Sequence, residues 1–160
     1  MEDKYILTDE TMKLGGITLH RIEAIRDFGN VKAGDKGGWI EKEKNLSQDG
    51  TCWVGDNAKV YDGAQICGDA QVYENAQIYD DADVCASAQV YGNARVYGCA
   101  GVIGDAKVYG NARVYGFADV CAYSQVYGNA QVYFYSQVIG YAKVYGDAKV
   151  TRFVYEHAQV

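Results

Sequence analysis

The chain has no proline among its 160 residues and only two histidines, His20 and His157. It also lacks any apolar run close to the ~20 residues that a membrane-spanning helix needs. No basic segment followed by an apolar stretch opens the chain, so we see no export signal. The formal net charge of −6 disfavours DNA and membrane surfaces, which are themselves anionic. We therefore expect a cytoplasmic protein with no membrane partner and no nucleic-acid partner.

Five cysteines are present, and none of them forms a Cys-x-x-Cys pair. An odd number of cysteines fits a reducing compartment, in which thiols stay free. We interpret these residues as small apolar side chains, the usual role of unpaired cysteine. The five are Cys52, Cys67, Cys85, Cys99 and Cys121.

A six-residue repeat dominates the sequence from Val54 to Val150, where every sixth residue is valine or isoleucine. A small residue, in most repeats alanine, stands two positions before each of them, and turn-forming pairs such as Gly92–Asn93 follow. Residues two apart point to the same side of an extended strand, and glycine and asparagine tolerate the positive φ of a tight turn. Each hexad therefore predicts a short strand followed by a corner. One hexad cannot bury its apolar side alone, so coils of the chain must stack.

The outward residue after each valine or isoleucine shows how many hexads make one coil. Residue types at this position sort with a period of 18, which predicts three strands per coil and a triangular cross-section. One column is Tyr61, Tyr79, Tyr97, Tyr115 and Tyr133; a second is Tyr73, Tyr91, Tyr109, Tyr127 and Tyr145; the third is Cys67, Cys85, Ile103, Cys121 and Ile139.

This pattern resembles the hexapeptide-repeat superfamily, which implies an all-β fold: a left-handed parallel β-helix over residues 39–160. The segments GGWIE at 37–41 and NLSQ at 45–48 also resemble a subgroup of uncharacterised bacterial and prophage proteins, often labelled polymer-forming or transferase-like. Residues 1–38 lie outside the repeat. We predict that they form an N-terminal β cap with short strands at 5–8, 17–20 and 22–25, because the end of a β-helix exposes an unpaired strand edge.

The superfamily is known for acyltransferases, and the resemblance implies a histidine base, a loop that leaves the coil and an acyl-carrier cleft in a trimer. Here neither histidine lies in the regular coils, and no loop interrupts residues 54–150. We therefore predict no catalytic residue and no cofactor. A divergent or inactive acyltransferase that uses acetyl-CoA or an acyl carrier stays the alternative.

We also predict no metal site. The β-helical carbonic anhydrases bind zinc through three histidines, and this chain has two at its opposite ends. Among the cysteines, Cys121 lies two coils beyond Cys85, about 10 Å away at the usual spacing between strands. Ligands of one zinc ion lie about 2.3 Å from it, so these thiols cannot share an ion.

The three outer faces differ in chemistry. We call the face of the cysteine and isoleucine column the plain face, and large aromatic residues stand at the corners beside it in the second half of the chain. Such an apolar surface usually marks an association site, so we predict the interface of a homo-oligomer, a trimer by the resemblance with a dimer as the alternative. The predicted interface residues are Cys67, Cys85, Ile103, Cys121, Ile139, Phe117, Tyr123, Phe134, Tyr135 and Tyr141.

The two tyrosine faces pair their columns with long polar side chains, and they are a second candidate surface for a partner, such as a host or phage protein. The residues concerned are Tyr97, Tyr115, Tyr133, Tyr91, Tyr109, Tyr127, Arg95 and Arg113. Charge is also uneven: residues 54–90 carry seven acidic side chains against one lysine, and residues 91–152 carry six basic side chains against three acids. We predict a non-enzymatic, self-associating scaffold or binding module, in one version a phage-type protein that sequesters or inhibits a host factor.

Overall fold

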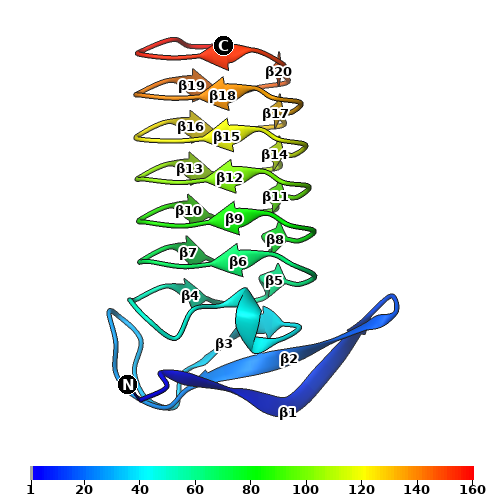
Figure 1. Cartoon of the computed structure of the whole chain (residues 1–160), viewed down its shortest axis with the longest axis vertical. Helices are drawn as coiled ribbons and strands as arrows, with labels where there is room; N and C mark the ends of the chain where they lie inside the picture. The colour runs from blue at the N-terminus through cyan, green and yellow to red at the C-terminus, as the bar shows by residue number, and fades with distance from the viewer. Residues whose placement is uncertain (1) are drawn as a thin grey trace.

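The computed structural model describes residues 2–160, which form an all-β protein with a single short 3₁₀ helix, η1 (Glu43–Asn45). From Trp53 onward the chain winds into about six stacked coils, each made of three very short strands joined by corners (Figure 1). The strands of successive coils lie parallel and 18 residues apart, as in the pairing of Val90 with Val108. The predicted all-β class and the three hexads per coil are confirmed.

Each coil contributes one strand to each of three sheets. The first tyrosine face, which includes the N-terminal segment, comprises β1 (Tyr5–Leu14), β2 (Ile17–Ala24), β3 (Lys36–Ile40), β5 (Lys59–Val60), β8 (Gln77–Ile78), β11 (Arg95–Val96), β14 (Arg113–Val114), β17 (Gln131–Val132) and β20 (Lys149–Val150). The second tyrosine face comprises β4 (Trp53–Val54), β7 (Gln71–Val72), β10 (Gln89–Val90), β13 (Lys107–Val108), β16 (Gln125–Val126) and β19 (Lys143–Val144). The plain face comprises β6 (Gln65–Ile66), β9 (Asp83–Val84), β12 (Gly101–Val102), β15 (Asp119–Val120), β18 (Gln137–Val138) and β21 (Phe153–Val154).

The core is a continuous column of valine, isoleucine and alanine inside the coils. Val96 and Ala94 are fully buried, and the same holds for nearly every equivalent pair along the solenoid. Where serine replaces alanine, its hydroxyl donates to a nearby carbonyl oxygen, as Ser136 Oγ does to Tyr133 O at 2.8 Å. The repeat therefore places its aliphatic residues inside and its polar residues outside, as predicted.

The corners adopt the left-handed backbone conformation that the turn-forming residues indicated. Gly110 has φ 68°, and the same turn position is occupied by Ala122 at 58° and Phe134 at 60°. Backbones of adjacent coils lie so close that a Cβ atom on Gly92 would stand 2.9 Å from the Gly110 nitrogen. Glycine fits this position best, since it avoids both the strained φ and the close contact.

The N-terminal segment extends the first tyrosine face rather than forming a separate layer. Strands β1 and β2 form an antiparallel hairpin around Gly15–Gly16, β2 pairs with β3, and β3 pairs in parallel with β5 (Figure 1). The three short strands expected from the sequence are in fact two long ones, of 10 and 8 residues. The hairpin buries Tyr5, Leu19 and Ile22 against the end of the solenoid.

The last coil is irregular because only two residues, Thr151 and Arg152, separate β20 from β21. Strand β21 still pairs with β18, so the corner between β20 and β21 is shorter than the other corners. Phe153 and Tyr155 are both 61% exposed, and the residues from 149 onward line an open hollow of about 780 Å³. The two rings therefore leave this end of the solenoid uncovered. No helix among residues 2–160 is long and apolar enough to cross a membrane.

Candidate functional site

The most apolar part of the outer surface lies on the plain face in the C-terminal half. The column that contains Ile103, Cys121 and Ile139 follows strands β12, β15 and β18, which pair in register. Ile103 is 43% exposed and Ile139 is 37% exposed, although neither lies at a chain end. Aliphatic side chains in this position gain nothing from water, so this column is a candidate contact surface.

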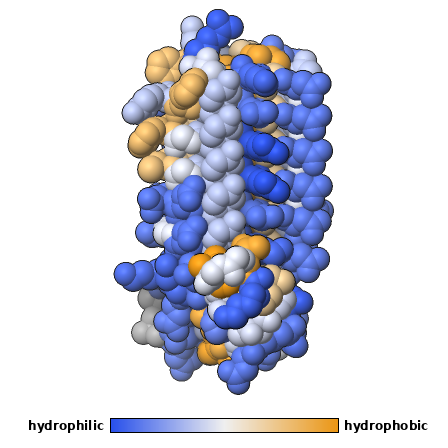
Figure 2. Space-filling view, turned by 90° about the vertical axis from the view of Figure 1, so that its right-hand side faces the viewer, coloured by the Kyte–Doolittle hydropathy of each residue, from blue (hydrophilic) through white to orange (hydrophobic). Residues whose placement is uncertain are grey.

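Aromatic side chains stand at both corners of the plain face. Phe117 stacks on Tyr135 at one corner with 4.8 Å between ring centroids, and Tyr123 stacks on Tyr141 at the other with 5.0 Å. Phe134 is 62% exposed. Figure 2 shows apolar side chains gathered along one edge of the C-terminal half of the solenoid. We call the combined surface the association patch: Ile103, Phe117, Cys121, Tyr123, Phe134, Tyr135, Ile139 and Tyr141.

Cys67 and Cys85, which were grouped with this surface, lie on the N-terminal coils and form a disulfide with 4.7 Å between their Cα atoms. The interpretation of the cysteines as small apolar residues with free thiols is therefore wrong for this pair. Parallel pairing in register places residues 18 apart side by side, and that brings the two sulfur atoms together. Cys52 is buried as expected, whereas Cys99 is exposed at a corner.

Asp119 is a charged residue on the plain face inside the association patch. Partial burial raises the pKa of its carboxyl group, against the opposing effect of hydrogen bonds from Gln137 and the Gly101 backbone. Burial also raises the pKa of the Cys121 thiol, and the negative charge of Asp119 raises it further. An acid that is already partly desolvated costs less to bury further, so it does not exclude an interface here.

The two tyrosine columns form continuous stacks. Centroids of successive rings in the column through Tyr97 and Tyr115 are 4.9 Å apart, with an angle of 1° between the ring planes. Each ring covers the face of the next, so the stacks present ring edges and hydroxyl groups. Tyr115 Oη donates to Gln131 Oε1 at 3.1 Å, which ties the column to the polar side chains beside it.

The stacked phenols should ionise late. Burial raises the pKa of Tyr61 to about 12 and also raises the pKa of Tyr79 and Tyr97 above the usual value of 10.0. A pKa that is higher in the folded chain means that stability is complete below pH ~10 and falls as the pH rises through the folded value. We expect phenolate absorbance of the native protein to rise at higher pH than that of the protein in denaturant. Coincident titration curves would contradict stacked, half-buried rings.

Arg95 and Arg113 lie on adjacent strands of the first tyrosine face and pair directly across β11 and β14. Within residues 2–160 neither guanidinium forms a salt bridge with a carboxylate. The two unpaired charges and the neighbouring tyrosine edges could contact a partner protein, so this face is the second candidate partner surface. Its role as a partner surface stays a prediction.

The acidic residues of the early coils have a local structural role. The Asp56 carboxylate accepts a hydrogen bond from the Glu74 backbone N–H at 3.0 Å, and Glu74 in turn accepts from the Gly92 N–H at 2.7 Å. Asp80 accepts from the Gly98 N–H in the same way at 3.0 Å. These carboxylates satisfy corner N–H groups of the next coil, and this accounts for part of the acidic excess without a basic partner.

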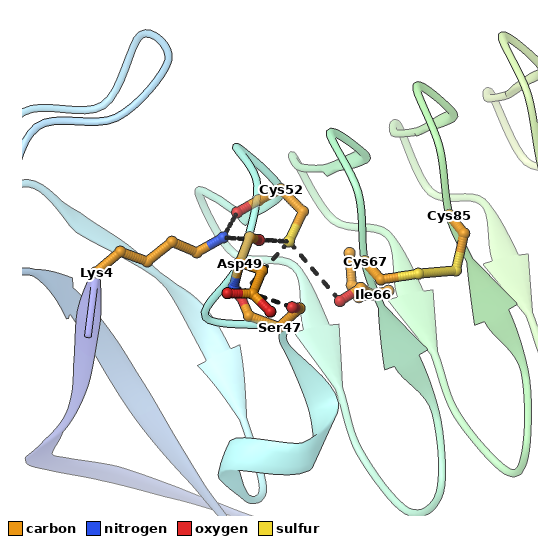
Figure 3. The surroundings of a disulfide bond; sticks show 7 residues. All are labelled: Lys4, Ser47, Asp49, Cys52, Ile66, Cys67 and Cys85. Carbon is orange, nitrogen blue, oxygen red and sulfur yellow. Dashed lines mark hydrogen bonds between the residues drawn. A yellow bond between two sulfur atoms is a disulfide. The ribbon is translucent and has the colours of Figure 1, made fainter. Parts of the chain in front are cut away.

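A buried amine and thiol meet beneath the N-terminal hairpin (Figure 3). Lys4 is fully buried, and its Nζ donates to the carbonyl oxygens of Asp49 at 3.1 Å and Cys52 at 3.0 Å. The same Nζ lies 3.2 Å from Cys52 Sγ and 5.1 Å from the centroid of the Phe28 ring. Burial raises the pKa of the Cys52 thiol, although Lys4 acts in the opposite direction. The sequence offered no signal for this pair, because Lys4 lies outside the repeat.

The two histidines lie at opposite ends of the molecule. His20 Nδ1 contacts the Thr8 carbonyl oxygen at 3.2 Å, and the exposed His157 ring stacks on Tyr141 with 5.2 Å between centroids. No group of three or more side chains suited to hold a metal occurs within residues 2–160. The two histidines therefore do not share one site.

The repeat and the stacked parallel coils define the class: the chain is a hexapeptide-repeat β-solenoid protein. Residues 88–104 match the family described as YdcK Beta solenoid repeat. A stretch of 57 residues, 35% of this chain, is 46% identical to a protein of Escherichia coli K12 described as "Uncharacterized acetyltransferase YdcK". The chain spans only 18% of the length of that relative.

Proposed function

We propose that this protein is a self-associating scaffold whose copies meet through the association patch. The observation that carries the proposal is the concentration of exposed rings and aliphatic side chains on the plain face and its corners, whereas the other two faces pair stacked tyrosines with polar side chains. Phe134 at 62% exposed and Tyr135 at 74% exposed are costly in water, and burying apolar area yields about 25 cal/mol per Å². The resemblance to the superfamily favours three copies over two.

The flat shape of the plain face suits such an interface. Its strands pair in register, and each aromatic ring at its corners stacks on a second ring that restricts its rotation. A rigid surface loses little conformational entropy when it docks. The phenylalanine and tyrosine side chains of the association patch also match the enrichment of aromatic residues at interfaces.

Replacing a residue of the association patch by a charged one should produce monomers. We expect Ile103→Arg and Phe134→Asp each to shift the solution mass to the 17.6 kDa of one chain, because association would then bury an unpaired charge. Multi-angle light scattering after size-exclusion chromatography measures this mass. Lys107→Asp, on the second tyrosine face, is the control and should leave the mass unchanged. If both patch variants keep the wild-type mass, the surface is misassigned.

A second candidate function, acyl transfer, is favoured by one observation, the 46% identity of a short stretch to a protein described as an acetyltransferase. A transferase of this kind needs an acyl-CoA site. Calorimetric titration of the purified protein with acetyl-CoA tests it: saturable binding supports the enzyme, and no binding supports the scaffold. If binding occurs, His157→Ala shows whether the exposed histidine at the open end of the solenoid belongs to that site.

A further inference from the structure

Lys4 and Cys52 form an amine–thiol pair that the association surface does not use. We propose that this pair is a covalent modification site, at which dioxygen joins Lys4 Nζ to Cys52 Sγ through one bridging oxygen atom. The resulting Nζ–O–Sγ link would fasten the chain just before β1 to the first coil of the solenoid. It is independent of the Cys67–Cys85 disulfide, which joins two later coils.

The first argument is the position of the two reacting atoms. Nζ and Sγ are already 3.2 Å apart, and the fold holds both in place. The carbonyl oxygens of Asp49, Gly50 and Cys52 all lie 3.0–3.3 Å from Nζ and fix the end of the lysine side chain. A bridging oxygen leaves nitrogen and sulfur one atom apart, so the link needs less movement than a direct N–S bond.

The second argument is the chemistry of the surroundings. Within residues 2–160 Lys4 forms no salt bridge with a carboxylate, although its amine is fully buried. A buried ammonium without a counter-ion is costly, and conversion into an uncharged link removes that cost. The Phe28 ring lies 5.1 Å from Nζ, and Cys52 is itself fully buried, so other thiols do not reach it in the folded chain.

The third argument is access for a small oxidant. The carbonyl-bearing residues Asp49 and Gly50 lie in an exposed loop between η1 and β4, directly over Cys52. Figure 3 shows Lys4 reaching this loop from the N-terminal side while Cys52 meets it from the solenoid side. Dioxygen is small enough to pass beneath an exposed loop, whereas a second protein is not. Oxidation at this site therefore favours the lysine amine as the partner.

The reaction balances with dioxygen as the only added reactant. One S–H bond of Cys52 and two N–H bonds of the Lys4 ammonium break, and one N–O and one S–O bond form. One oxygen atom stays as the bridge, and the other leaves as water with two of the hydrogens. The remaining proton goes to solvent. The amine and the thiol are oxidised, and dioxygen is reduced.

High-resolution mass spectrometry of tryptic peptides tests the proposal. After exposure of the full chain to oxygenated buffer, we expect a peptide pair that joins the segments around Lys4 and Cys52. Its mass should equal the sum of the two peptides plus one oxygen and minus two hydrogens, and reductant should reverse the link. Recovery of Cys52 only as a thiol, a sulfur acid or a disulfide would overturn the proposal, as would a link without the added oxygen.

Three variants serve as controls for this experiment. Cys52→Ala should abolish the linked peptide while the protein folds, because alanine occupies the equivalent position in most later hexads. Lys4→Arg should also abolish it. The double variant Cys67→Ser/Cys85→Ser should keep the full amount of linked peptide, since the disulfide takes no part. Loss of the link in the double variant would contradict the assignment to Lys4 and Cys52.

Discussion

Val96→Asp should abolish folding of the solenoid. The Val96 side chain is fully buried in the middle of the apolar column, between Ile78 and Val114 at the equivalent positions of the two adjacent coils. A carboxylate there has no hydrogen-bond donor within reach, and its desolvation costs about 5 kcal/mol or more, comparable to the whole stability of a small domain. Circular dichroism should show loss of β structure, or a chain that is found only in aggregates.

The neighbouring substitution Arg95→Asp is the matched control for this prediction. Arg95 lies one residue earlier on the same strand, β11, and points to solvent. We expect a native spectrum and a change in unfolding free energy below about 1 kcal/mol. Similar effects of the two substitutions would contradict the alternation of inward and outward residues on which the fold depends.

Lys4→Met should destabilise the protein by about 2–4 kcal/mol. Methionine fills nearly the same space, but it leaves three carbonyl oxygens of the loop before β4 without the ammonium that donates to them. An unsatisfied buried acceptor such as Cys52 O costs about 1–3 kcal/mol, and the two part-buried carbonyls cost less because water reaches them; removal of a buried charge offsets part of this loss. Urea denaturation monitored by tryptophan fluorescence measures the change, since Trp53 packs beside this region.

The exposed Lys32, replaced by methionine in the same way, is the control for Lys4→Met. Lys32 is on the surface, and its salt bridge to Asp27 is exposed on both sides. Such a pair contributes about 0–1 kcal/mol, so we expect a much smaller change. Equal stabilities of the two variants would show that water replaces the Lys4 amine at the loop carbonyls.

The stacked coils could be predicted from the sequence because the six-residue pattern that produces each strand and corner is local and recurs along the chain. The invariant spacing from Val54 to Val150 and the sorting of outward residues by 18 positions are direct consequences of strands stacked in register. The turns could be predicted because corner residues such as Gly110 readily adopt a positive φ. Each hexad has the same order of a small residue, an aliphatic residue and turn-forming residues. One unusual residue such as Ser124 therefore does not change the predicted fold.

The features outside the repeat could not be predicted in the same way. The Lys4–Cys52 contact joins residues 48 apart through a hairpin whose position depends on the whole N-terminal segment. The Cys67–Cys85 pair was correctly placed on adjacent coils, but general expectations for thiols in a reducing compartment favoured two free side chains. The plain-face column and its aromatic corners did follow from the period of 18, and their role as an interface depends on copies that a single chain does not contain.

Sedimentation velocity of the wild-type protein across a concentration series tests the central claim most directly. Association through the apolar face of the C-terminal coils predicts a species whose mass is a small whole multiple of 17.6 kDa and which dissociates only on dilution. A species of 17.6 kDa at every concentration would contradict the scaffold.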